Sequence, residues 1–241
     1  QHVADVKAFQ TALNEAVRVA RDGAIVTLGI EPSRPETGFG YIQLGETVSG
    51  VARRVAAFVE KPNAATAESY VASKKYLWNA GIFVFRADVM AEAFRRHMPE
   101  VATAVSKIAA SIGTRNETAV VKREFQKMPA VSIDYGVAEK ESEMVVVPCR
   151  CGWSDVGSFQ ALSEVRRADA DGNVVTGDGA ILIDSSGCVV WGDKRPIAVV
   201  GMRDVVVIDA ADSILVLPKQ RSQDVRRVID ALKSRRLTQY L

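Results

Sequence analysis

The sequence predicts an α/β fold followed by a small β-rich, β-helix-like unit with a closing helix, and three observations support this. Apolar residues recur three or four apart from Val3 to Ala20, and this helical pattern leads into the β-branched run Ala24–Ile30. Strand and helix patterns then alternate to about residue 165, which is typical of α/β proteins. After Asp169, glycines separate short apolar runs at near-regular spacing, as in stacked β units.

The individual elements follow from the same patterns and from turn and capping residues. In the first part we expect a helix over Val3–Ala20, strands over Ala24–Ile30, Ile42–Gly45 and Val51–Val59, a helix over Ala64–Ser73 that begins after Asn63, a strand over Leu77–Phe85, a helix capped by Asp88 through Arg96, a helix from Pro99 toward Ile112, a strand over Met144–Val147 and a helix from Ser158 through Val165. In the second part we expect strands over Ala180–Ile183, Cys188–Trp191, Ile197–Val200 and Asp204–Ile208 and a helix over Gln223–Leu232. We therefore expect two domains, residues 1–171 and 172–241, with a boundary near Gly172.

Composition is that of an ordinary globular protein, with 48% hydrophobic and 25% charged residues. The 31 basic and 29 acidic residues are intermixed, so we expect no nucleic-acid partner. Apolar stretches fall far short of the roughly 20 residues that cross a bilayer, so we expect no membrane span. Three cysteines and only two histidines, none at a zinc-ligand spacing, indicate buried or idle thiols and a cytoplasmic location.

The sharpest local motif is Phe58-Val59-Glu60-Lys61-Pro62, where opposite charges follow a buried strand. Open α/β sheets bind ligands at strand ends. A lysine there can meet a phosphate, and a glutamate can accept hydrogen bonds from sugar hydroxyls. The alternative is a solvated turn after a strand.

Three further segments could line a ligand site. The loop Pro35–Tyr41 contains Gly38 and Gly40, where backbone could approach a ligand, although glycines also serve in plain turns. Trp78-Asn79-Ala80-Gly81 offers an amide beside small residues at the mouth of a strand, or else a core tryptophan with Asn79 capping a turn. In Gly152–Ser158, Asp155 could bind magnesium or cap the following helix.

Taken in order, the segments PETGFGYI, FVEKP, WNAGIFVF, SIDYGV and GWSDVGS resemble bacterial mannose-1-phosphate guanylyltransferases, within the wider sugar nucleotidyltransferase family. The resemblance runs from the first helix to about Leu162, and the tail around Gln223-Asp224-Val225 is also similar. It implies a Rossmann-like, GT-A-like mixed sheet with helices on both faces. It also implies transfer of GMP from GTP to mannose 1-phosphate, with Mg²⁺, giving GDP-mannose and pyrophosphate.

The resemblance also implies roles for particular residues. By motif match, Lys61 holds the sugar phosphate, Glu60 and Asn79 the sugar hydroxyls, and Gly40 makes a backbone contact. Asp155 holds the metal, and Asp134 in SIDYGV is a neighbour of the site. The family's glycine-rich G-x-G-x-R segment and first metal-binding aspartate would lie before Gln1, so we expect residues upstream of this sequence.

Other functions remain open at this stage. The sequence also fits a thymidylyl- or uridylyltransferase for another sugar phosphate, or a non-catalytic sugar-nucleotide-binding subunit. A scaffold whose β-rich tail mediates association is a further alternative. A homodimer is expected in each case, because stacked β units with exposed ends often associate.

Overall fold

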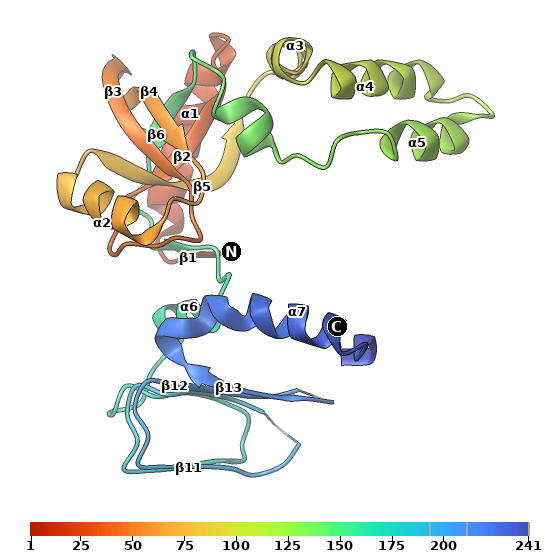
Figure 1. The fold of residues 1–241 in the computed structure, drawn as a ribbon. Helices are drawn as coiled ribbons and strands as arrows, with labels where there is room; N and C mark the ends of the chain where they lie inside the picture. The colour runs from red at the N-terminus through yellow and green to blue at the C-terminus, as the bar shows by residue number, and fades with distance from the viewer. Residues whose placement is uncertain (193, 211, 241) are drawn as a thin grey trace. The chain divides into compact units, whose positions relative to one another are not determined.

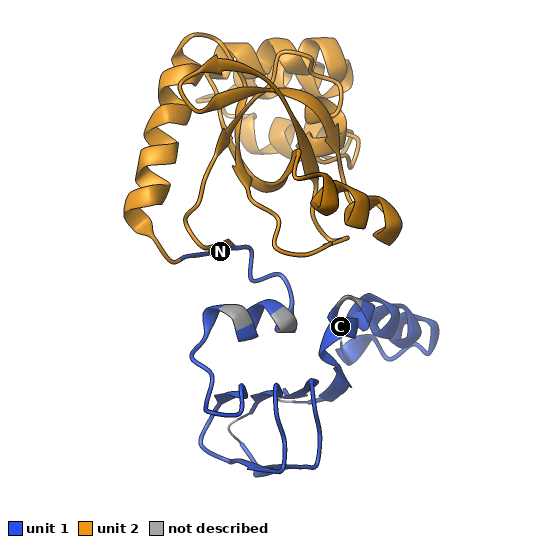
Figure 2. Cartoon of the chain, turned by 90° about the vertical axis from the view of Figure 1, so that its left-hand side faces the viewer, with its two compact units in different colours: residues 1–3, 154–241 blue, residues 4–153 orange. Residues whose placement is uncertain are grey.

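The computed structural model describes residues 1–192, 194–210 and 212–240. The chain divides into two compact units, shown in Figure 2. The larger unit comprises residues 4–153, and the smaller unit comprises residues 1–3 and 154–241.

The larger unit is built on a mixed sheet of five strands that closes into a barrel in the order β2-β5-β3-β4-β6 (Figure 1). These strands are β2 (Val26–Ile30), β3 (Tyr41–Ser49), β4 (Ala52–Val59), β5 (Tyr76–Val84) and β6 (Val145–Pro148). Strand β2 pairs parallel with β6 and antiparallel with β5, and all five of its residues are buried. Closure comes from a short antiparallel pairing of β4 with β6 and was not predicted from the sequence.

Two helices that lie beside the barrel begin at side-chain caps. In α1 (Val6–Arg21), Asp5 accepts a hydrogen bond from the Ala8 amide at 2.9 Å. Helix α2 (Ala64–Ser73) begins as predicted, with the Thr66 amide donating to Asn63 Oδ1 at 2.9 Å. Each cap satisfies one of the amides that a helix start leaves without a partner.

Three further helices follow β5: α3 (Ala87–His97), α4 (Pro99–Ser111) and α5 (Glu117–Phe125). Helices α4 and α5 form a hairpin that extends away from the barrel (Figure 1). The prediction that Asp88 caps α3 was wrong, because Arg86 occupies the cap position and Asp88 lies in the first turn, ion-paired with Arg86. A carboxylate in the first turn still favours the helix through its dipole.

A five-residue π-helix, η1 (Asp134–Ala138), precedes β6 and was also not predicted. Its buried residues Val137 and Ala138 join one hydrophobic core with the barrel and α3. Gly136 allows close packing there, since a Cβ at this position would overlap Met98 Sδ at the end of α3.

The smaller unit is a stack of short strands. Its elements are β1 (His2–Val3), α6 (Phe159–Val165), β8 (Val174–Thr176), β9 (Ala180–Ile183), β10 (Val189–Trp191), β11 (Ile197–Val200), β12 (Val205–Asp209), β13 (Ile214–Pro218), η2 (Lys219–Asp224), α7 (Val225–Ser234) and η3 (Thr238–Tyr240). The division between the units falls within the short strand β7 (Trp153–Ser154). Strands β8, β10 and β12 pair in parallel, β13 adds antiparallel to β12, and β9 pairs in parallel with β11. Parallel strands that recur on successive turns of the chain form a β-helix-like unit, so the predicted fold class is confirmed.

Candidate sugar-phosphate site

Five of the six site residues predicted from the sequence lie in one network in the larger unit. Gly40 immediately precedes β3, Glu60 and Lys61 follow β4, Asn79 lies in β5, and Asp134 begins η1. The sixth, Asp155, belongs to the smaller unit.

Glu60 and Lys61 form an ion pair at the end of β4, with the Lys61 ammonium donating to Glu60 Oε1. The Glu60 side chain is only 6% exposed, whereas that of Lys61 is 42% exposed. The hydrogen bond with Glu60 raises the pKa of Lys61 by more than burial lowers it, and the nearby charges of Glu60, Tyr135 and Asp134 raise it further. Lys61 is therefore a fixed positive charge that solvent, or a phosphate, can reach.

The backbone at Lys61 is unusual. Its φ of 49° lies in the left-handed region although the residue carries a side chain and precedes Pro62. Residues before proline favour extended conformations, and left-handed ones cost energy that surrounding contacts must offset. The solvated-turn alternative from the sequence does not account for this strain or for the burial of Glu60.

The amide of Asn79 has both ends fixed by hydrogen bonds. Its Oδ1 accepts from Thr27 Oγ1 at 2.9 Å and from the Gly81 amide at 3.1 Å. Its Nδ2 donates to Asp134 Oδ1 at 3.1 Å. An amide nitrogen carries two hydrogens, so one remains for a ligand.

Position 40 requires glycine because other site residues lie too close for a side chain there. A Cβ at Gly40 would overlap Glu60 Oε2 and would lie 3.4 Å from the Cβ of Asn79. The Gly40 carbonyl accepts from the Asn79 amide at 2.8 Å. The glycine therefore lets the buried carboxylate lie directly against the backbone.

Sequence reasoning missed two residues of this network, Thr27 and Glu139. Thr27 is fully buried in β2, where a hydroxyl within an apolar run was the only available signal. Glu139 follows η1, and its Oε1 accepts from the Glu60 amide at 3.0 Å. No spacing in the sequence indicates that contact, which joins positions 79 apart.

An aromatic cluster adjoins the glycine-containing loop. Phe39 contacts the rings of Trp78 and Trp153 edge-on at 5.1 and 5.7 Å, and the Arg34 guanidinium lies 5.7 Å from the Trp78 ring. The Tyr41 hydroxyl accepts from the Glu36 amide at 2.9 Å. Trp78 is thus a core residue, as its alternative interpretation predicted, while Asn79 also contributes to the polar network.

Asp155 lies in the loop between β7 and α6. Its Oδ1 accepts from the Gly157 amide at 2.9 Å, and Ser158, not Asp155, caps α6. Within the described part of the chain, no group of three or more His, Cys, Asp or Glu side chains could hold a metal ion. Magnesium commonly takes one or two protein carboxylates and completes its shell with phosphate oxygens and water, so a single carboxylate fits that ion.

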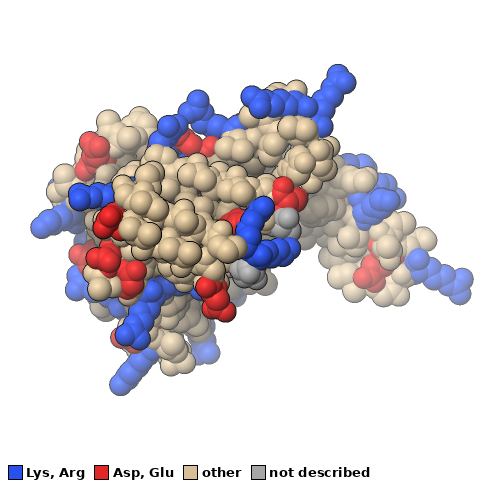
Figure 3. All heavy atoms as spheres, turned by 90° about the horizontal axis from the view of Figure 1, so that it is seen from below, with Lys and Arg blue, Asp and Glu red and all other residues tan. Residues whose placement is uncertain are grey.

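Charge and hydropathy of the described residues add two findings. On the face drawn in Figure 3, Lys and Arg side chains are interspersed with Asp and Glu. None of the helices in the described ranges has the length and apolar character needed to span a membrane.

Known proteins resemble this chain in sequence. The sequence profile of the nucleotidyl transferase family matches residues 1–172, and that of the mannose-phosphate isomerase/GMP-like β-helix domain matches residues 178–232. A putative mannose-1-phosphate guanylyltransferase of Vibrio cholerae is 40% identical over 99% of this chain and 51% of its own length. The mannose-1-phosphate guanylyltransferase of Escherichia coli K12 is 39% identical over 96% of this chain and 49% of its own length.

A solved structure is similar as well. The structure of a mannose-1-phosphate geranyltransferase from Thermus thermophilus matches with a TM-score of 0.84 and 40% identity, covering 96% of this chain and 67% of that one. The chain spans about half the length of the curated relatives that it matches. By its fold, its β-helix-like unit and these similarities, the chain belongs to the nucleotidyl transferase family.

Proposed function

We propose that this chain is part of a mannose-1-phosphate guanylyltransferase, which transfers GMP from GTP to mannose 1-phosphate and releases GDP-mannose and pyrophosphate. The observation that carries the proposal is the network of Gly40, Glu60, Lys61, Asn79 and Asp134. It combines a reachable cation with buried, oriented hydrogen-bonding groups, which suits a phosphorylated sugar. Similarity to relatives named mannose-1-phosphate guanylyltransferases supports the choice of substrate.

In the proposed reaction, a phosphate oxygen of mannose 1-phosphate attacks the α-phosphorus of GTP, and the bond to pyrophosphate breaks. Lys61 holds the sugar phosphate by charge and hydrogen bonding. Glu60 accepts from sugar hydroxyls, and the remaining Nδ2 hydrogen of Asn79 donates to one. Asp134 keeps the Asn79 amide in the orientation that leaves this hydrogen available. Such positioning is the main contribution that a protein makes to phosphoryl-group transfer.

Asp155 is the residue proposed to hold a divalent cation, specifically Mg²⁺. When bound, this ion would neutralise charge on the phosphates. The support is the fit of one carboxylate to magnesium chemistry, with its Oδ1 already fixed by the Gly157 amide.

Pyrophosphate release tests the proposal. Purified protein would receive Mg²⁺, mannose 1-phosphate and each common nucleoside triphosphate, alongside Lys61→Ala and Asp155→Asn variants. Lys75→Ala is the matched control, because Lys75 is exposed and lies outside the network. A preference for GTP that both variants lose and the control keeps would support the proposal.

The same assay separates the alternatives. A preference for dTTP or UTP would identify a thymidylyl- or uridylyltransferase. No release with any triphosphate, while mannose 1-phosphate still binds, would leave a non-catalytic binding subunit. Lack of binding as well would overturn the assignment of the site.

Three further features are part of the proposal. The domain boundary near Gly172 is supported by the two family profiles. The nucleotidyl transferase profile ends at residue 172, and the β-helix profile begins at residue 178. The compact units divide earlier, after Trp153. A homodimer and a cytoplasmic location are proposed from the sequence, and sedimentation of the purified protein would test the dimer.

A further inference from the structure

The π-helix η1 places two carboxylates against two different parts of the candidate site. Asp134, its first residue, accepts from Asn79 Nδ2 at 3.1 Å. Glu139, directly after its last residue, accepts from the Glu60 amide at 3.0 Å. The Glu139 amide donates back to the Asp134 carbonyl at 2.9 Å, which holds the two residues one turn apart. π-helices are rare and occur often at functional sites.

Glu139 holds the Val59–Glu60 peptide group, one residue before the strained Lys61. The left-handed conformation of Lys61, with its φ of 49°, persists only where surrounding contacts enforce it. The hydrogen bond from the Glu60 amide to Glu139 fixes that peptide from outside β4. Without it, the preference for extended backbone before Pro62 would favour a different direction for the Lys61 side chain.

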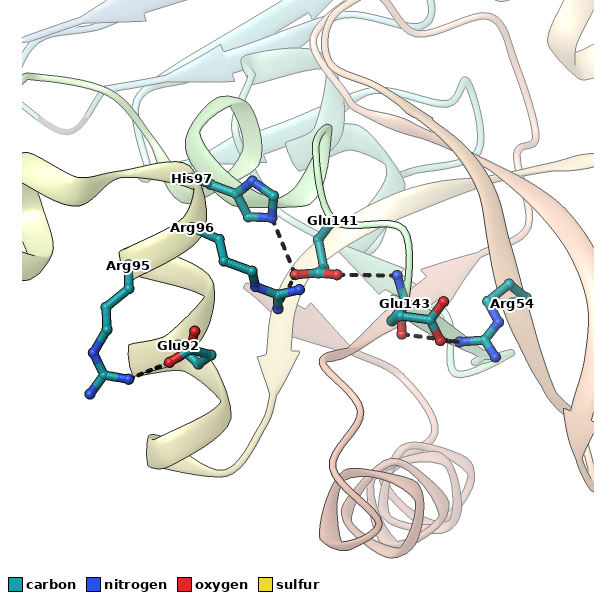
Figure 4. Close-up of polar contacts among 7 residues, drawn as sticks. All are labelled: Arg54, Glu92, Arg95, Arg96, His97, Glu141 and Glu143. Atoms are coloured by element: carbon teal, nitrogen blue, oxygen red, sulfur yellow. Dashed lines mark hydrogen bonds and ion pairs between the residues drawn. The ribbon is translucent and has the colours of Figure 1, made fainter.

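Glu141, two residues after Glu139, is bonded to side chains of α3, as Figure 4 shows. Glu141 Oε2 accepts from Arg96 Nη2 at 2.7 Å and lies 3.3 Å from His97 Nε2. Its Oε1 accepts from the Glu143 amide at 3.2 Å. The Glu141 side chain is only 3% exposed, so this anchor is a buried one. Glu139 is thus presented to β4 from a segment that is fixed at both ends.

We propose that Glu139 is a positioning residue for the sugar phosphate. By holding the Glu60 amide, its carboxylate sets the directions of the Glu60 and Lys61 side chains. This inference rests on the proposed function of the site. Glu139 touches neither substrate nor reacting atoms in this role, so its loss should weaken sugar-phosphate binding without altering GTP binding.

The test compares Glu139→Ala with Glu139→Gln, whose amide oxygen can still accept the hydrogen bond. Glu143→Ala is the control, because Glu143 is a 71% exposed carboxylate on the same segment, paired with Arg54. The measurements are hydrogen exchange of the Glu60 amide, calorimetric affinity for mannose 1-phosphate, and KM for each substrate.

In Glu139→Ala we expect exchange of the Glu60 amide to accelerate about tenfold or more, and the Kd and KM for mannose 1-phosphate to rise about tenfold. The KM for GTP should change less than about twofold, and Glu139→Gln should restore most of the affinity. Glu143→Ala should match the unmodified protein.

Two failures are distinguishable. If the unmodified protein binds mannose 1-phosphate and Glu139→Ala binds it equally well, the positioning role is wrong and the proposed function stands. A parallel rise in both KM values with a lower Tm would likewise show a merely structural role. If the unmodified protein neither binds nor turns over mannose 1-phosphate, the proposed function fails, and the positioning role fails with it.

Discussion

Thr27 Oγ1 donates a hydrogen bond to Asn79 Oδ1 at 2.9 Å, joining the most buried strand of the barrel to the candidate site. The Gly81 amide donates to the same oxygen. Both donors hold the Asn79 oxygen on their side, so the amide is oriented with its nitrogen toward Asp134. A fully buried hydroxyl therefore determines the orientation of an amide at the site.

Replacing Thr27 by valine should disturb this orientation while nearly preserving volume. We expect mannose 1-phosphate to bind about tenfold more weakly, since a buried acceptor loses one of its two donors, at a cost of about 1–3 kcal/mol. Calorimetry with the sugar phosphate would measure the loss. Thr27→Ser, which keeps the hydroxyl, is the control, and equal affinities for the valine and serine variants would argue against this role.

Gly40→Ala should be destabilising because its Cβ would overlap Glu60 Oε2. Forcing an extra methyl into a packed site costs about 1–3 kcal/mol. In a Glu60→Ala background the carboxylate that the new Cβ would overlap is absent. Gly40→Ala should then lower the free energy of unfolding much less. Denaturant unfolding of the single and double variants would give this coupling, and additive effects would contradict the predicted contact.

Binding of mannose 1-phosphate should persist to unusually high pH. The pKa of Lys61 is raised above its ordinary value of 10.5, chiefly by the hydrogen bond with Glu60. The ammonium is therefore charged below that value and loses its proton only as pH rises through the higher folded pKa. Calorimetric titrations upward from pH 8 should show affinity decline only above the ordinary lysine pKa of 10.5. In Glu60→Gln, which lacks the negative partner, the decline should begin at lower pH.

Stability in alkali should depend on Cys149. Burial, with smaller contributions from Cys151 and Asp5, raises the pKa of this thiol from 9.0 to about 12. The neutral thiol thus stabilises the fold fully below pH 9, and this stability is lost as pH rises toward about 12, because the unfolded chain releases the proton first.

Unfolding free energies measured between pH 8 and pH 11 would test this dependence. Cys149→Ala should flatten the decline above pH 9, whereas Cys188→Ala, which also removes a buried thiol, should retain it. A decline of the same slope in the Cys149→Ala variant would refute the assignment to Cys149.

The sequence by itself determined the fold class and most elements, because periodicity and caps are local. Asn63 and Ser158 begin their helices as predicted, and the glycine-separated runs after Asp169 form parallel stacked strands. Motif resemblance also selected Glu60, Lys61 and Asn79, whose neighbours in sequence carry the signal.

Only the tertiary structure decided how these residues are held. Closure of the barrel, the π-helix at Asp134 and the contacts of Thr27 and Glu139 all join segments far apart in sequence. The residues next to Thr27 or Glu139 in the sequence do not indicate which distant residue each will contact. Such long-range contacts exist only once the chain has packed, because packing, and not propensity, brings their atoms within hydrogen-bonding distance.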